Sequence, residues 1–375
     1  MAMLEPSNRS TWRNADPAML VITLVLIGFG LVTLYSAGDR ELGFASIVVK
    51  QTIFVVVGLV AMAILAALDY RFWRFLSVPL YLVALALLVL VLRFGALWGG
   101  AQRWFDLKFI SFQPSEAAKL ATIVALSAFI SLRGTHMRGP FSFGAAGLIA
   151  AVPAVLVFIQ PDLGTALIFI AIWVVVITVS RTRGLYLIGC AMAAVPLTYY
   201  FWHNVFHQYQ RDRLLIFRHP ETDETGQGFN IIQAKITIGQ AGLVGHRFAD
   251  TPQINQYQRL VVSESDFAFA HAIGNFGFIG ALALFTLYLL LIWRYLRVAH
   301  LARDEFGQLI AVGAAAMLFF QAFINIGMNI NLLPVVGIPL PFISAGGVSL
   351  VTLLALQGIL QSVLMHRERL AFGSG

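Results

Sequence analysis

Residues 17–36 read PAMLVITLVLIGFGLVTLYS and contain no charged side chain. A run of about 20 apolar residues is what a helix needs to cross a bilayer. The rest of the chain has the same character, because 59% of its 375 residues are apolar, 11% are charged and the mean hydropathy is +0.82. A soluble domain carries about 25% charged residues, so this composition excludes a protein that faces water on all sides.

Nine further runs of this kind predict an all-α polytopic membrane protein with ten transmembrane helices. The expected spans lie near residues 17–36, 46–67, 75–94, 115–132, 141–159, 163–180, 184–202, 266–293, 308–327 and 341–365. Residues 1–16 and 366–375 are then terminal segments around one transmembrane domain at 17–365. One large hydrophilic segment, at about 203–265, separates the seventh and eighth spans. Its apolar and polar residues alternate too irregularly to distinguish a strand from an interfacial helix.

The distribution of Lys and Arg predicts the orientation, because positive residues are retained on the cytoplasmic side. With a cytoplasmic N-terminus, thirteen basic residues fall inside: Arg9, Arg13, Arg71, Arg74, Arg133, Arg138, Arg181, Arg183, Arg294, Arg297, Arg303, Arg367 and Arg369. The short outer connections and the first turns of the fourth span hold fewer: Arg40, Lys50, Arg93, Arg103, Lys108 and Lys119. We therefore expect both termini in the cytoplasm and the 203–265 segment outside.

The net charge, the cysteine count and the motif content exclude several classes of protein. The formal charge of +7 comes from residues in loops and at span ends, so it indicates topology rather than nucleic-acid binding. Cys190 is the single cysteine, so the chain has neither a disulfide nor a CxxC metal pair. The sequence has no P-loop, HExxH, GxSxG or dinucleotide motif.

Three acidic residues lie at outer helix ends among apolar or small residues: Glu116, Asp162 and Asp266. Because charge is costly in hydrocarbon, their occurrence at about the depth of Arg103 and Lys119 predicts one outward-opening polar site. Apolar residues after Asp266 would raise its pKa by desolvation, which suits a general base. Alternatively, Asp266 is an acidic residue stabilised by the dipole of the following helix.

The fourth span is expected to begin at Gln113-Pro114-Ser115-Glu116, with Ser115 as a candidate cap. Glu116 and Lys119 are three residues apart and therefore share a helix face. They either bind a polar or phosphorylated group together or neutralise each other as an ion pair.

Other polar positions also allow two interpretations. Asp162 caps the sixth span or belongs to the polar site. The segment 337–347, GIPLPFISAGG, contains Ser344 and breaks the helical pattern, so it lines the site or forms a re-entrant turn. Arg211 and Arg213 clamp a phosphate group or remain solvated loop charges.

Several motifs occur in one order along nearly the whole chain and are specific when taken together. They are Arg103-Trp104, Phe112-Gln113-Pro114-Ser115-Glu116 with Lys119, Gln160-Pro161-Asp162-Leu163-Gly164-Thr165, Gly226-Gln227-Gly228-Phe229 with Gln233 and Ile238-Gly239, Asp266-Phe267, Asn325-Ile326-Gly327-Met328, Leu333-Pro334, and Gly337 to Gly347. In these motifs and in its ten spans, the chain resembles the SEDS membrane glycosyltransferases, the RodA and FtsW proteins of bacterial cell-wall synthesis. The external arginines and Asp304-Glu305-Phe306-Gly307 favour the RodA branch.

The resemblance implies a reaction and residue roles. The protein would polymerise lipid II, the undecaprenyl-pyrophosphate-linked disaccharide pentapeptide, into β-1,4 glycan strands on the outer face of the bacterial cytoplasmic membrane, during elongation and cell-shape maintenance. Asp266 falls at the family's essential aspartate and would be the general base. The expected substrate-binding residues are Arg103, Gln113, Ser115, Glu116, Lys119, Asp162, Arg211, Arg213 and Ser344.

The resemblance also implies a partner and a source of positive charge. Arg103 and Lys119, or a divalent cation such as Mg²⁺ or Mn²⁺, would compensate the charge of the leaving pyrophosphate. The partner would be a class B penicillin-binding protein, a transpeptidase with a single membrane span. Three positions depart from the family: Glu264-Ser265 replaces His-Thr, Gly274-Asn275 replaces an acidic pair, and Ala345 replaces tyrosine.

Two other functions fit a chain of ten helices. A lipid II flippase or transporter would need polar residues through the bilayer, whereas spans such as 54–67 and 167–178 have no charge and the candidate carboxylates gather on one side. A scaffold for the transpeptidase is compatible with catalysis. The sequence therefore favours an enzyme whose reaction takes place on one side of the membrane, at the outer face of the cytoplasmic membrane.

Overall fold

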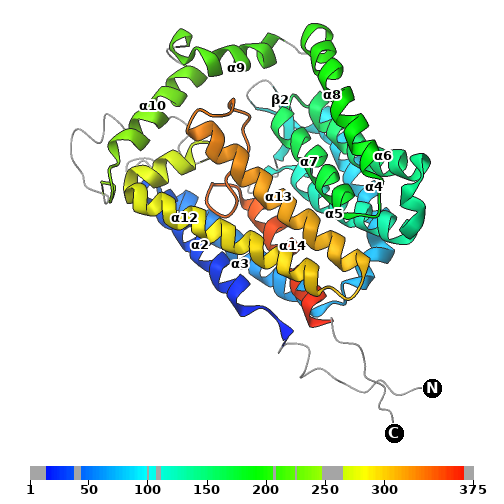
Figure 1. Ribbon diagram of the computed structural model, residues 1–375. Coiled ribbons are helices and arrows are strands. Elements are labelled where there is room, and N and C mark those ends of the chain that lie inside the picture. The colour runs from blue at the N-terminus through cyan, green and yellow to red at the C-terminus, as the bar shows by residue number, and fades with distance from the viewer. Residues whose placement is uncertain are drawn as a thin grey trace.

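The computed structural model in Figure 1 describes residues 14–37, 44–98, 101–106, 111–205, 208–223, 226–246 and 265–366. Ten apolar helices make up most of these residues: α2 (Pro17–Ala37), α3 (Phe44–Ala67), α4 (Arg71–Phe94), α5 (Pro114–Arg133), α6 (Pro140–Ile159), α7 (Leu163–Val179), α8 (Gly184–Asn204), α12 (Ala268–Leu301), α13 (Glu305–Asn329) and α14 (Gly347–Met365). Within the described ranges, nine are long and apolar enough to cross a membrane and α7 is a shorter apolar helix. The predicted all-α polytopic fold is confirmed.

The helices differ in how deeply they are buried. Most residues of α5, α13 and α14 are buried, whereas α8 buries none of its residues. α3 and α14 approach closely at Gly358, where a β-carbon would lie 2.5 Å from the main-chain oxygen of Met62. Small residues that allow such an approach are typical of packed transmembrane helices. The core of the bundle is therefore built around α5, α13 and α14.

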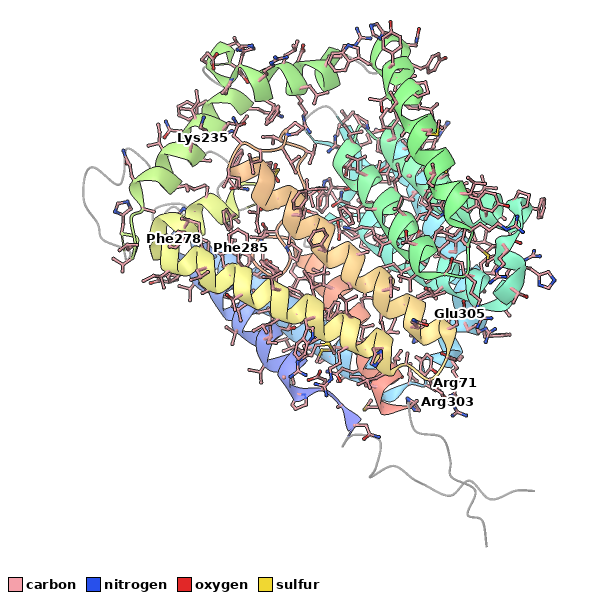
Figure 2. The ribbon with its side chains drawn as sticks, in the orientation of Figure 1. Arg71, Lys235, Phe278, Phe285, Arg303 and Glu305 are labelled. Carbon is pink, nitrogen blue, oxygen red and sulfur yellow. The ribbon has the colours of Figure 1, made fainter. Side chains whose placement is uncertain are left out.

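Large apolar side chains cover the outer surface of the bundle. Phe278 and Phe285 of α12, labelled in Figure 2, are 61% and 42% exposed. Arg71, Arg303 and Glu305 instead lie at one end of the bundle, where α4 and α13 begin. An apolar surface bounded by charged ends fits the hydrocarbon core of a bilayer.

The first and last helices meet at the same end of the bundle. The main-chain N–H of Asp16 donates to Gln361 Oε1 at 2.8 Å, and Gln361 Nε2 donates to the Asp16 carbonyl at 2.9 Å. We call this the terminal end, since α2 begins and α14 ends there (Figure 1). The opposite end, which we call the loop end, carries α9 (Gln208–Arg218) and α10 (Gln227–Gln240) (Figure 1).

The hydrophilic segment between the seventh and eighth spans is helical where it is described. Besides α9 and α10 it contains the short 3-10 helix η3 (Pro220–Thr222). α10 packs against α12 and buries Ile231 and Ala234. This settles the choice between strand and helix for that stretch in favour of a helix. Residues 247–264, including Glu264, lie outside the described part of the chain.

A small antiparallel sheet at the loop end connects α4 to α5. It consists of β1 (Ala96–Trp98), β2 (Ala101–Asp106) and β3 (Ser111–Phe112), with β2 in the middle. Phe105 pairs with Phe112, and the chain continues directly from β3 into α5. Strands of two to six residues carry too little alternation to be predicted from sequence. The sheet nevertheless places Arg103 at the turn that follows α6.

Two helices begin later than predicted. The eighth begins at Ala268 instead of 266, so Asp266 lies in a turn before it. The tenth begins at Gly347 instead of 341, because the Pro- and Gly-rich residues before it form turns. Both shifts leave irregular backbone at the loop end, where the candidate carboxylates lie.

α12 is broken at Gly277, whose φ of 67° and ψ of −163° are not helical. The segment after α10 supplies hydrogen bonds around the break. Phe278 N donates to the Gly242 carbonyl at 2.9 Å, and His246 N donates to the Gly274 carbonyl at 2.9 Å. Main-chain groups that such a break leaves without helical partners are normally hydrogen-bonded by other protein groups. The break therefore separates a buried half-helix, 268–276, from the long apolar half.

Gly277→Ala is expected to destabilise the protein. This backbone conformation is essentially restricted to glycine, and a β-carbon would lie 2.3 Å from Gly245 N. We expect a loss of about 1–3 kcal/mol in the free energy of unfolding, measured by thermal unfolding in detergent. Gly239→Ala in α10 is the control, because no atom lies within 4 Å of its β-carbon. An equal effect of the two substitutions would contradict the role of Gly277.

Candidate active site

Asp266 lies in a turn that is held by its main chain. Its carbonyl oxygen accepts hydrogen bonds from Asn325 Nδ2 at 3.1 Å and from Asn329 Nδ2 at 2.9 Å. Ser344 Oγ donates to the Ser265 carbonyl at 2.6 Å. These bonds engage the peptide groups rather than the carboxylate. The carboxylate itself interacts with the side chain of Ser265, so these three bonds hold the turn without it.

Asp266 is half-buried, and its carboxylate lies in a charged environment. A β-carbon on Gly337 would lie 3.7 Å from its Oδ2. Burial raises the pKa of this carboxyl above its ordinary value. Arg213, a hydrogen bond from the Ser265 side chain and Arg103 oppose the rise, and the negative charge of Asp162 adds to it. Four segments distant in sequence therefore place ionisable groups within electrostatic range of one another.

Arg103 of β2 closes the turn between α6 and α7. Its Nε donates to the Gln160 carbonyl at 2.8 Å, and its Nη2 donates to the Pro161 carbonyl. Gln160 Nε2 in turn donates to the Leu88 carbonyl at 3.1 Å. The guanidinium group thus holds the turn between α6 and α7 through its hydrogen bonds. Its positive charge also lowers the pKa of the Asp266 carboxyl.

Asp162 has both roles that the sequence left open. Its Oδ1 accepts from Thr165 N at 3.0 Å and caps α7, and its Oδ2 accepts from Gln113 Nε2 at 3.5 Å. The same carboxylate affects the pKa of Asp266. Capping fixes Asp162 in place, and its position makes it part of the acidic cluster.

The segment 337–347 packs between these elements. The main chain of Val336 lies against α7, since a β-carbon on Gly164 would be 2.9 Å from the Val336 oxygen. Asn325 Nδ2 donates to the Ile338 carbonyl at 2.7 Å as well as to Asp266. One amide of α13 therefore ties the broken segment to the turn that bears the candidate base.

Glu116 and Lys119 form a buried ion pair in the first turns of α5. The distance between Lys119 Nζ and Glu116 Oε1 is 2.7 Å, and the side chains are 1% and 3% exposed. Glu116 Oε2 and Ser115 Oγ are buried without a hydrogen-bond partner among the described residues. Buried polar atoms normally have partners, so these two oxygens have capacity for water or a polar ligand.

The arginines of α9 are placed differently. Arg213 is within electrostatic range of Asp266, and in its favoured amide orientation Gln227 accepts hydrogen bonds from Arg213 Nη2 and Nε at 3.1 and 3.2 Å. Arg211 donates from Nη2 to the His203 carbonyl at the end of α8, at 3.1 Å. Of the two predicted arginines, Arg213 is the one that the structure brings to the carboxylates.

The comparisons with known proteins agree with this architecture. Residues 17–369 match the family described as cell cycle protein, FtsW/RodA/SpoVE. The chain belongs to the FtsW/RodA/SpoVE family. It is 37% identical over 372 residues, 98% of each chain, to the protein named peptidoglycan glycosyltransferase MrdB of Escherichia coli strain K12.

Solved structures of this family share the fold. A chain from the structure described as "Structural coordination of polymerization and crosslinking by a peptidoglycan synthase complex" aligns with a TM-score of 0.80 and 30% identity, covering 94% of this chain and 98% of that one. The rod shape determining protein RodA of Thermus thermophilus aligns with a TM-score of 0.71 and 27% identity, covering 95% of this chain and 98% of that one. The resemblance of the sequence to RodA and FtsW is confirmed.

The departure from the FtsW/RodA/SpoVE pattern at Gly274-Asn275 has a structural basis. α10 covers this part of α12, and a β-carbon on Gly274 would lie 2.8 Å from Thr237 Cγ2. Asn275 Nδ2 donates to Ser36 Oγ, which is also 2.8 Å from His271 Nε2. A neutral packing contact and a hydrogen-bond network therefore occupy the place where the acidic pair is expected.

Sequence reasoning did not assign a role to Asn325, which lies in one of the FtsW/RodA/SpoVE motifs, or to Asn329, which directly follows that motif. Both lie on α13, four residues apart, and Asn329 Nδ2 also donates to the Asn325 carbonyl at 2.8 Å. Two buried amides one turn apart in an apolar helix are a detectable signal. Their partner, the main chain of Asp266, could not be identified without the tertiary structure.

Proposed function

We propose that this protein is a peptidoglycan glycosyltransferase that polymerises lipid II into β-1,4 glycan strands during cell elongation and cell-shape maintenance, with Asp266 as the general base. The observation that carries the proposal is a desolvated carboxylate among two arginines and a second carboxylate, in a family whose relatives are named for this activity. A base needs a pKa above that of an ordinary aspartate to accept a proton efficiently.

In the proposed reaction the acceptor sugar's 4-hydroxyl donates its proton to Asp266. The oxygen attacks the anomeric carbon of the donor, and the bond from that carbon to the pyrophosphate oxygen breaks with inversion. The pyrophosphate leaves with the bonding electron pair and additional negative charge. Arg103, Arg213 and Lys119 supply positive charge from three different elements, and preorganised charge of this kind lowers the barrier.

The dependence of the Asp266 pKa on the charge of Arg213 predicts a shift in the pH profile of polymerisation. The base acts when it is deprotonated, so activity is lost as the pH falls through its raised pKa. Arg213 holds that pKa down, and Arg213→Gln is therefore expected to move the acidic limb of the polymerisation rate to higher pH. Arg218→Gln, on the same helix but exposed, is the control. A shift to lower pH, or an equal shift in both variants, would contradict the assignment.

A divalent cation, Mg²⁺ or Mn²⁺, stays a prediction. The described ranges contain no group of three His, Cys, Asp or Glu side chains suited to a metal ion. Glu116 is paired with Lys119, and Asp162 already accepts two hydrogen bonds. Mg²⁺ is usually held by one or two carboxylates together with substrate phosphates, so Asp162 and the pyrophosphate would hold it and it would compensate leaving-group charge. The proton transfer to Asp266 does not depend on it.

We also propose the orientation and the partner. The excess of basic residues at the terminal end supports cytoplasmic termini, and with them a loop end on the outer side of the bacterial cytoplasmic membrane. A class B penicillin-binding protein is the proposed partner, supported by the likeness to a chain from a peptidoglycan synthase complex. A flippase is less well supported, because α6, α7 and α14 carry no charged residue along their length.

The direct test is incubation of the purified protein with labelled lipid II, with and without a candidate transpeptidase. We expect glycan strands, resolved by gel electrophoresis. Movement of lipid II across the bilayer of a proteoliposome without polymer formation would instead support the flippase.

A further inference from the structure

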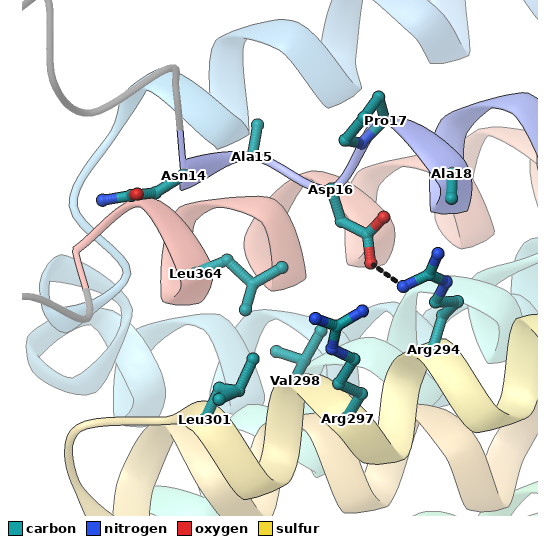
Figure 3. Close-up of a pocket in the computed structure, with 10 residues that line it drawn as sticks. All are labelled: Asn14, Ala15, Asp16, Pro17, Ala18, Arg294, Arg297, Val298, Leu301 and Leu364. Atoms are coloured by element: carbon teal, nitrogen blue, oxygen red, sulfur yellow. Dashed lines mark ion pairs between the residues drawn. The ribbon is translucent and has the colours of Figure 1, made fainter.

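A pocket lies at the terminal end, far from the carboxylates, between the beginning of α2 and the ends of α12 and α14 (Figure 3). Its volume is about 260 Å³. Asp16, Arg294 and Arg297 provide its polar walls, and Val298, Leu301 and Leu364 provide its apolar ones. The pocket is therefore amphipathic.

One wall of the pocket is rigid. Asp16 Oδ2 pairs with Arg294 Nη1 at 3.4 Å, and the two side chains are 11% and 17% exposed. Asp16 Oδ1 accepts from Met19 N at 3.2 Å, while Gln361 binds both main-chain groups of Asp16. This carboxylate is fully engaged within the protein. Its negative charge compensates the positive charge of Arg294.

Arg297 is the group without such compensation. It lies three residues after Arg294 and lines the same pocket (Figure 3). Its guanidinium has no hydrogen bond or ion pair with any described residue, and the side chain is exposed. Two guanidinium groups against one carboxylate give the pocket a net positive charge. A guanidinium of this kind suits bidentate binding of a phosphate.

The neighbours of the pocket on α12 indicate its level in the membrane. Trp293 is 54% exposed, its ring lies under the Arg294 guanidinium at 5.0 Å, and Leu296 is 47% exposed. Tryptophan on the surface of a membrane protein marks the level of the lipid headgroups. The pocket thus opens where headgroups lie, at the end of the apolar half of α12.

We propose that this pocket binds the phosphate headgroup of an anionic phospholipid in the cytoplasmic leaflet. Arg297 contacts the phosphate, the Asp16–Arg294 pair forms the polar wall, and Val298, Leu301 and Leu364 contact the glycerol and the first acyl carbons. Basic pockets between helices on the cytoplasmic side are suited to anionic headgroups. The leaflet assignment rests on the orientation in the proposed function, whereas binding itself does not.

The test uses the full chain in nanodiscs of phosphatidylcholine that contain a small fraction of photoactivatable phosphatidylglycerol. Crosslinked peptides are mapped by mass spectrometry. We expect labelling of the peptide around Arg297 and a loss of about tenfold or more in Arg297→Gln, as for other charge-assisted hydrogen bonds. Arg303→Gln removes the same charge at the same end outside the pocket, and is expected to retain most of the labelling.

Other outcomes would overturn the proposal. An equal loss in the two arginine variants would indicate general attraction to the surface. Equal labelling by a phosphatidylcholine probe would show that headgroup charge is not recognised, and displacement by inorganic phosphate would identify a site for a free anion. Asp266→Asn is expected to bind phosphatidylglycerol normally, so a failure of this proposal can be distinguished from a failure of the proposed glycosyltransferase.

Discussion

Asp266→Asn is expected to abolish glycan polymerisation and leave the protein folded. Asparagine has nearly the same shape as aspartate but cannot accept the proton of the sugar hydroxyl. A positioned general base contributes about 10²- to 10⁴-fold to rate, so polymer formation should fall by at least about 100-fold. The fold should be retained because Asn325, Asn329 and Ser344 bind the main chain of this turn rather than the carboxylate.

Polymer formation from labelled lipid II measures the effect of Asp266→Asn, with thermal unfolding as the check on folding. Glu221→Gln is the matched control, because Glu221 lies in the same connection between α8 and α12 but its side chain is 68% exposed. Polymerisation close to that of the wild type in Asp266→Asn would remove this residue as the base. An equal loss in both variants would show that the assay responds to charge alone.

Breaking the Glu116–Lys119 pair is expected to have the largest effect on stability. Lys119→Met leaves a carboxylate that is 3% exposed without its cation. Removal of one partner of a buried pair costs about 3–5 kcal/mol. The double variant Glu116→Gln with Lys119→Met is expected to recover most of that loss, because replacing both charges of a buried pair is often nearly neutral.

The polymerisation activity of variants distinguishes a purely structural Glu116–Lys119 ion pair from a pair that binds a ligand. If Glu116 and Lys119 only neutralise each other, the double variant and the exchanged pair Glu116→Lys with Lys119→Glu should polymerise lipid II normally. We expect both to remain impaired, since the unpartnered oxygens beside the pair have capacity for a ligand. Thermal unfolding and polymerisation of the same preparations measure this. A loss of less than about 1 kcal/mol in Lys119→Met would contradict the buried charge pair.

The spans could be predicted because their signal is local. Apolar runs bounded by polar residues predicted 17–36 and 163–180, and the helices are Pro17–Ala37 and Leu163–Val179. The break at Gly277 and the packing of α10 on α12 could not be predicted in this way. They depend on contacts between residues 28 to 36 positions apart, such as His246 with Gly274 and Phe278 with Gly242, for which the sequence alone carries no periodic signal.

The candidate site could be predicted in part for the same reason. The predicted topology placed Asp162, Asp266 and Arg103 on the same side of the membrane, because the order of the spans determines which helix ends lie on that side. The choice of Arg213 over Arg211 depends on the rotational phase of α9, a helix that the sequence did not reveal. The main-chain anchors Asn325 and Asn329 depend on how α13 meets a turn that lies 59 and 63 residues away.

The position of the carboxylates at the helix ends has a consequence for how reactants arrive. Asp266 precedes α12 by two residues and Asp162 caps α7, so both lie at helix ends, at the loop end of the bundle. The proposed orientation puts this end at the outer membrane surface. A substrate with a long isoprenoid tail reaches this depth by lateral diffusion, without extracting its tail into water. Encounter is then a two-dimensional search, governed by the surface density of the lipid-linked sugar in one leaflet rather than by its bulk concentration.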